Sequence, residues 1–211
     1  MKWHAIIAVL AAAAMSAAAF AAPRSVSVTA VGVNLADPRW EAVEEAVGYW
    51  NEQFAAIGAG IRLGPVTRLI QPVPDEAVRD LGEATMRTGP AGDRYATVLP
   101  DGLAQLPGDI IVVFSALDFI SFGRLYSPGR KGLVAISRPD VPPRSLPNVL
   151  RNLLAHEMGH ALGLRHNDDP AMLMCGRPAP CRPGAFASAT KRFFPLTEAD
   201  KATLRAHWPP Q

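Results

Sequence analysis

The sequence has few cysteines, no cluster of basic residues and no internal repeat. Cysteine occurs only twice, and 21 basic residues nearly balance 19 acidic ones, which leaves a net charge of +2. Because the lysines and arginines are scattered rather than clustered, nucleic acid is not an expected partner. After the leader there is no internal repeat and no low-complexity tract. Apolar residues make up 49% of the 211 residues, enough to bury the core of one ordinary domain.

The single long apolar run lies at the start of the chain. Lys2 precedes the apolar residues 5–20, and residues 19–21 (Ala-Phe-Ala) have the small-x-small pattern of a cleavage site. The run is shorter than the ~20 residues that a membrane span needs, so a stable anchor is the weaker interpretation. No cysteine lies near the cleavage site, so a lipid anchor is not indicated. We expect residues 1–21 to be a signal peptide and residues 22–211 to form one domain of an exported protein, periplasmic or extracellular, with an alanine-rich leader of bacterial type.

The pattern of apolar residues after the leader predicts strands and helices in the same domain. Strands are expected at residues 25–33, 61–70, 110–114 and 133–137, with the third in the centre of the sheet. Helices are expected at residues 38–57, 74–86, 146–162 and 197–208, and a loop at 121–132. The last helix begins at Thr197, whose capping box closes on Asp200.

The third of these helices carries residues suited to hold a metal ion. His156 and His160 are four residues apart, so their imidazoles lie on one face and can reach one zinc at ~2.0–2.1 Å. Glu157 lies about 100° further round the helix, where it can approach a water without being a ligand. Gly163 can adopt the left-handed conformation that ends a helix, which would bring His166 round as the third ligand. Three protein ligands leave one position for water, as in a catalytic zinc site.

This arrangement predicts hydrolysis of a peptide bond. A zinc ion lowers the pKa of its water to ~7 and polarises a carbonyl, while Glu157 acts as general base and then delivers the proton to the leaving amine. Three of the five histidines of the chain belong to the motif. With Gly163 and His166 included, a chance match is on the order of one in a hundred thousand. Ordinary histidines on a surface or core helix are therefore the weaker interpretation.

From His156 to His166 the residues resemble the metzincin peptidases, and within them the matrixins. The pattern HExxHxxGxxH is met in full, and Met174 stands eight residues after His166, at the spacing of the methionine turn in that family. The resemblance implies a zinc metallo-endopeptidase with a protein or peptide substrate, in which Met174 forms a hydrophobic floor beneath the zinc.

The same resemblance implies the fold class. We expect an α+β, zincin-like catalytic domain with a mixed twisted sheet of about four to five strands, a long N-terminal helix, a metal-binding helix and a C-terminal helix. In the family, the strand that corresponds to residues 133–137 would be the sheet edge that pairs with extended substrate.

Several departures from the family pattern restrict what can be carried over. No cysteine precedes the metal helix, so a cysteine-switch propeptide is not expected. No histidine lies between His4 and His156, so we expect one catalytic zinc without the second, structural one. Calcium has no support beyond Asp118, an isolated acid for which a solvated loop position is the simpler interpretation. Cys175 and Gly176 replace the Tyr-Pro of the family, so no side-chain preference follows.

Cys175 and Cys181 flank a short loop after the methionine turn. In an exported protein they are expected to form a disulfide that shapes the wall of the specificity pocket. The alternative is a free thiolate that caps the zinc as an inhibitor, which an oxidising compartment disfavours.

Three functions remain in view. The first is a secreted, monomeric metallo-endopeptidase, the second a zinc-binding but non-hydrolytic module that captures peptides, and the third a metal-free interaction protein of the cell envelope. The presence of Glu157 favours the first, because a protein that only binds has no need of a base at that position.

Overall fold

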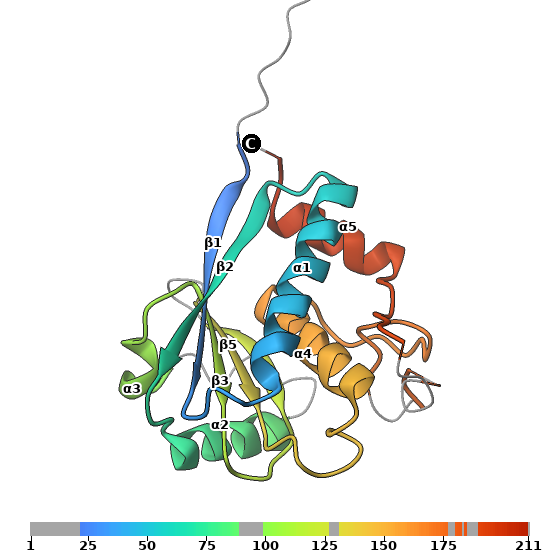
Figure 1. Cartoon of the computed structure of the whole chain (residues 1–211). Helices are drawn as coiled ribbons and strands as arrows, with labels where there is room; N and C mark the ends of the chain where they lie inside the picture. The colour runs from blue at the N-terminus through green and yellow to red at the C-terminus, as the bar shows by residue number, and fades with distance from the viewer. Residues whose placement is uncertain are drawn as a thin grey trace, which may run out of the picture.

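A computed structural model describes residues 22–88, 99–126, 131–176, 180–182, 184 and 190–210. The expected signal peptide lies outside the described residues. In chain order the elements are β1 (Arg24–Gly32), α1 (Arg39–Ile57), β2 (Ile61–Ile70), α2 (Asp75–Thr88), α3 (Asp101–Ala104), β3 (Ile110–Phe114), β4 (Phe122–Tyr126), β5 (Lys131–Ile136), α4 (Pro147–Ala161) and α5 (Glu198–His207). Figure 1 shows their arrangement.

The strands form one mixed sheet in the order β2-β1-β3-β5-β4. The first four in this order are parallel to their neighbours, and β4 is antiparallel to β5 at one edge. The predicted α+β class with a mixed sheet is therefore confirmed. The expectation of a central strand at residues 110–114 is confirmed as well, because β3 lies between β1 and β5.

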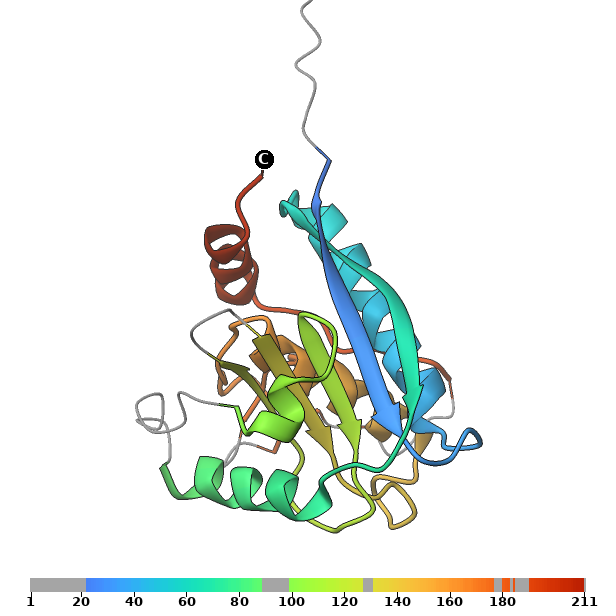
Figure 2. The same ribbon diagram turned by 90° about the vertical axis from the view of Figure 1, so that its left-hand side faces the viewer.

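Helices cover the two faces of the sheet. Because side chains alternate along a strand, Val112 of β3 packs in the core cluster that includes α1 and α4, whereas its neighbour Val113 packs in the cluster that includes α2 and α3. Figure 2 shows α2 and α3 on the near side of the sheet and α1 on the far side. Among the described residues, no helix combines the length and the apolar character that crossing a membrane requires.

The sequence interpretation was wrong about the sheet edge. Residues 133–137 were expected there, but β5 lies between β3 and β4, and the edge strand is β4. The sequence predicts a loop at residues 121–132, because the five residues Phe-Gly-Arg-Leu-Tyr of β4 do not alternate clearly and contain a glycine. The glycine has a packing reason. A Cβ at Gly123 would lie 1.8 Å from the carbonyl oxygen of Glu157, so the backbones of β4 and α4 approach each other there.

Candidate metal centre

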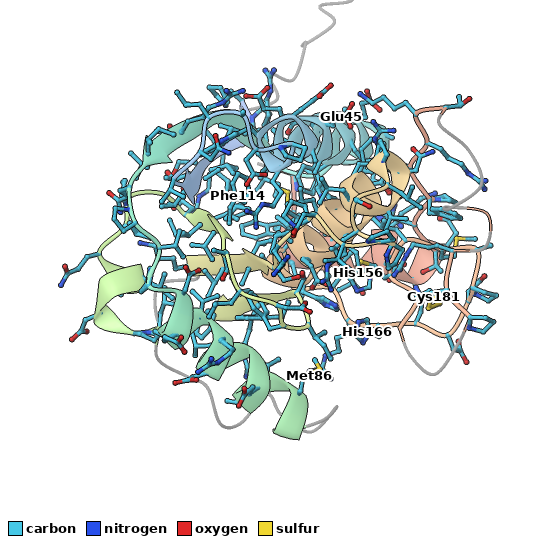
Figure 3. The ribbon with its side chains drawn as sticks, turned by 60° about the horizontal axis from the view of Figure 1, so that its bottom comes forward. Glu45, Met86, Phe114, His156, His166 and Cys181 are labelled. Carbon is cyan, nitrogen blue, oxygen red and sulfur yellow. A yellow bond between two sulfur atoms is a disulfide. The ribbon has the colours of Figure 1, made fainter. Side chains whose placement is uncertain are left out.

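Three histidine side chains converge on one point beside α4. The Nε2 atom of His156 lies 3.1 Å from that of His166 and 3.2 Å from that of His160, and the last two Nε2 atoms are 3.0 Å apart. Two ligands at about 2.0–2.1 Å from one ion, at tetrahedral angles, would be about 3.3–3.4 Å apart. The three imidazoles therefore fit a single zinc ion after shifts of a few tenths of an ångström. Figure 3 shows His156 and His166 side by side.

Hydrogen bonds to the backbone fix which ring nitrogen of His156 and of His160 faces the cluster. The Nδ1 of His156 lies 2.7 Å from the carbonyl oxygen of Leu173, and the Nδ1 of His160 lies 2.9 Å from that of Leu164. A carbonyl oxygen only accepts, so Nδ1 carries the proton in each ring and Nε2 presents its lone pair. Such a partner on the far nitrogen is the usual support of a histidine ligand.

The end of α4 turns the chain so that the third histidine reaches the other two. Leu164 donates its N–H to the carbonyl of Gly159 (2.9 Å), and Gly163 donates to that of His160 (3.0 Å). This pair of bonds is a Schellman motif, and it requires the positive φ of +99° found at Gly163. The ring of His207 in α5 fills the space that a Cβ at Gly163 would need, because that Cβ would lie 2.6 Å from the Nδ1 of His207. The turn places His166 three residues further on.

The segment after His166 folds back against the methionine turn. Asn167 donates its N–H to the carbonyl of Met174 (2.9 Å) and accepts from Gly176 (2.8 Å). Met174 is fully buried, and a Cβ at Gly159 would lie only 2.5 Å from its sulfur. The side chain of Met174 therefore packs directly against the turn of α4 between His156 and His160.

Glu157 is held at the same place by the edge strand. Its side chain is buried and accepts a hydrogen bond from the backbone N–H of Gly123. Burial raises the pKa of Glu157 to about 8, although this hydrogen bond and the positive charge of Arg182 act in the opposite direction. The carboxyl group is thus a buried, titratable group next in sequence to His156.

The imidazoles are neutral in this environment. Burial lowers the pKa of His160 to about 4, and it lowers the pKa of His156 and of His166 as well. A neutral imidazole is the form that binds a metal ion. His156 is buried, His160 is half-buried and His166 is exposed, so the site opens to solvent on the side of His166.

A row of asparagines continues the face of α4 that carries His156. Asn148 donates to the carbonyl of Thr190 (2.7 Å), and Asn152 donates to that of Arg192 (2.7 Å) and accepts from the N–H of Phe194 (3.0 Å). Asn148, Asn152 and His156 are spaced four residues apart, so they lie in one stripe along the helix. The two asparagines of this stripe bind the backbone of residues 190–194. The stripe fixes residues 190–194 alongside α4.

Cys175 and Cys181 form a disulfide, with 2.05 Å between the sulfur atoms and 5.5 Å between the Cα atoms. The free-thiolate alternative is thereby excluded for this structure. Figure 3 shows Cys181 on the same side of the molecule as His156 and His166. The sequence interpretation missed Arg182, whose Nη1 donates to the carbonyls of Leu173 (2.7 Å) and Cys175 (3.0 Å). Its one signal in the sequence is its place directly after the second cysteine.

In the described part of the chain, these histidines form the one group of three or more potential metal ligands. Asp118, the acid considered for calcium, instead accepts from Arg144 at 2.7 Å. Gly123 and Gly176 were also missed as site residues, because only the fold brings them to Glu157 and His166.

No protein-family model matches the sequence, and no curated protein matches it. Among solved structures, the archaemetzincin of Methanopyrus kandleri is similar to this chain, with a TM-score of 0.49 and 17% identity, over 87% of this chain and 95% of the other. A likeness of this size assigns neither a family nor an activity.

Proposed function

We propose that this chain is an exported, zinc-dependent endopeptidase of matrixin-like type. The observation that carries the proposal is the convergence of three histidine Nε2 atoms, which lie 3.0–3.2 Å apart. The buried carboxyl group of Glu157 lies beside this cluster without belonging to it. His156, His160 and His166 would hold the metal. A zinc ion held by three imidazoles supplies Lewis acidity that acidifies water to a pKa of ~7 and polarises a carbonyl.

Glu157 would move the protons of the reaction. Its carboxylate takes a proton from the attacking water as the new C–O bond forms at the scissile carbonyl, and gives that proton to the amine nitrogen as the C–N bond breaks. The N–H of Gly123 holds the carboxylate in place. The raised pKa of about 8 is consistent with a group that both accepts and releases a proton near neutral pH.

The substrate would add to the sheet along β4. In an antiparallel pair, successive residues face alternately the partner strand and the open edge. The N–H of Gly123 bonds to Glu157, away from β5. Leu125, two residues further along β4, would by this alternation direct its backbone groups to the same open edge. An extended peptide paired there would lie beside the catalytic carboxylate, and main-chain hydrogen bonds would supply part of the affinity.

Two further elements of the proposal depend on the sequence. Residues 1–21 would be removed as a signal peptide on export, and residues 22–211 would be the mature enzyme, a monomer with one zinc. The loop closed by Cys175 and Cys181 would form part of the wall of the specificity pocket.

The test is a cleavage profile of the mature chain on a peptide library, without chelator, with chelator, and after zinc is restored. We expect about one zinc per chain by elemental analysis, cleavage of internal peptide bonds, loss of cleavage with chelator and recovery with zinc. A protein that binds zinc and peptides but cleaves none would be the peptide-capturing module instead. A protein without bound metal would contradict both.

A further inference from the structure

Arg182 occupies an unusual position next to the disulfide. It follows Cys181 directly, and its backbone has φ of +55°, the only positive φ of a non-glycine residue in the described chain. Its N–H donates to the carbonyl of Pro170 at 2.6 Å. Residues other than glycine persist in this conformation only where their surroundings impose it. Here the imposing features are the disulfide on one side and the hydrogen bond to Pro170.

The side chain of Arg182 reaches behind the metal centre. Nη1 donates to the carbonyls of Leu173 and Cys175, which flank Met174, at 2.7 and 3.0 Å. The carbonyl of Leu173 is also the acceptor of the Nδ1–H of His156, at 2.7 Å. Nη1 lies 3.3 Å from that Nδ1, but both atoms carry protons, so the two groups meet at a shared acceptor and do not bond to each other. The carbonyl oxygen of Leu173 therefore links Arg182, which follows the disulfide, to His156, the most buried of the three histidines.

We propose that Arg182 is a positioning residue for the metal centre, held in place by the Cys175–Cys181 disulfide and acting through the Leu173 carbonyl on the orientation of His156. The proposal rests on the proposed function, since it takes the three histidines to be metal ligands. A planar guanidinium suits this task because it presents several N–H groups in a fixed fork, whereas an ammonium is a point charge on a flexible stem.

A purely electrostatic role predicts a different outcome. The positive charge of Arg182 contributes to the environment of all three histidines and of Glu157. A nearby cation repels a bound dication, so removal of the charge alone would tighten zinc binding. Removal of a positioning contact loosens it, because loss of a partner behind a ligand typically weakens metal binding about 10–100-fold. The direction of the change therefore separates the two roles.

The experiment measures the zinc dissociation constant of the mature chain by competition with a chelating indicator, and the visible spectrum of the cobalt(II)-substituted protein. Arg182→Ala should weaken zinc binding about 10–100-fold and alter the cobalt band. Arg182→Lys, which keeps the charge but not the fork, should resemble Arg182→Ala. Arg62→Ala removes an equal charge from the exposed face of β2, at the opposite edge of the sheet, and should leave both readouts unchanged.

The link to the disulfide is tested by a double-mutant cycle. The pair Cys175→Ser/Cys181→Ser removes the bond without leaving thiols that could bind zinc, and it should weaken binding in the same direction as Arg182→Ala. If the bond acts through Arg182, the combined variant should bind zinc little more weakly than Arg182→Ala alone. Each variant is first compared with the wild type by circular dichroism in the metal-free state, so that a misfolded variant is recognised and the remaining variants decide.

Unchanged or tighter zinc binding in Arg182→Ala, or an Arg182→Lys protein that matches the wild type, would overturn the positioning role. Fully additive effects in the cycle would overturn the link to the disulfide. If the wild type binds zinc and cleaves peptides but the variants match it, this inference fails while the proposed function stands. If the wild type binds no zinc, the proposed function fails as well.

Discussion

Gly176 has no room for a side chain next to His166. A Cβ at this position would lie 2.4 Å from Cγ and 2.7 Å from Nδ1 of His166. Atoms do not approach so closely, so the ring of His166 occupies the space that any other residue at position 176 would need. The absence of a side chain at position 176 is therefore part of how the ring of His166 is placed.

Gly176→Ala should displace His166 and weaken zinc binding by at least about tenfold, as other losses of ligand support do. A competition titration with a chelating indicator measures this. Gly48→Ala in α1, where a Cβ meets no atom within 4 Å, is the matched control and should leave zinc binding unchanged. Equal affinities for the two variants would show that His166 adapts to the extra methyl group.

Glu157 is proposed to act as the general base and not as a metal ligand. Glu157→Gln should keep the fold and about one zinc per chain but reduce kcat about 10²–10⁴-fold, the usual contribution of general acid–base catalysis. Glu52→Gln, an exposed position of α1, should be fully active. Wild-type kcat in Glu157→Gln would remove Glu157 from the mechanism.

At the scale of single elements, α4 has two tasks. Its C-terminal half presents His156 and His160, and its asparagine stripe holds residues 190–194. Asn152 is 1% exposed and makes three hydrogen bonds, two of them to the distant carbonyl of Arg192 and N–H of Phe194. The stripe therefore stabilises the backbone that leads into α5.

Asn152→Ala should lower the free energy of unfolding by about 2–4 kcal/mol. The buried N–H of Phe194 loses its partner, which costs about 1–3 kcal/mol, and the partly buried carbonyl of Arg192 loses its partner at a smaller cost. Urea unfolding measures the loss. Asn34→Ala, which removes an exposed hydrogen bond to the N–H of Ala36, should cost less than about 1 kcal/mol. Similar losses for the two variants would mean that residues 190–194 keep their place without the stripe.

The elements also differ in how far their sequences predict them. The long helix α1, the central strand β3 and the capping box of α5 follow from local patterns, and the structure contains all three. β4 could not be predicted in this way, because Gly123 serves a close approach to α4 that depends on a residue far along the chain. The spacing of the histidines predicted a metal site, but Arg182, Gly123 and Gly176 reach it only through tertiary contacts.

At the scale of the whole molecule, the metal centre affects stability through pH. In the metal-free protein, burial lowers the pKa of all three histidines from 6.5, to about 4 for His160, so they stay neutral while the unfolded chain takes up protons. Their contribution is present above pH 6.5 and is lost as pH falls. Glu157 acts in the opposite sense, because its pKa is raised from 4.5 to about 8, so its contribution is lost as pH rises between these values.

With three histidines against one glutamate, the metal-free protein should be most stable near pH 6.5 and lose stability towards pH 4.5 and towards pH 8. Urea unfolding in the presence of chelator measures this profile. Glu157→Gln should remove the decline above pH 6.5 and leave the acid side as it is. A decline that persists in this variant would have its origin elsewhere in the molecule.

In the proposed zinc site, the graded burial of the three histidines would give metal exchange a direction. His156 lies deepest, His160 is intermediate and His166 faces solvent, so an incoming chelator meets the bond to His166 first. We expect release of the ion to begin on that side, so that its bonds to His156 and His160 of α4 break last. The rate at which a chelator extracts the ion should then depend on the size and concentration of the chelator. The exposed side of the site, at His166, would be the route by which the ion enters and leaves.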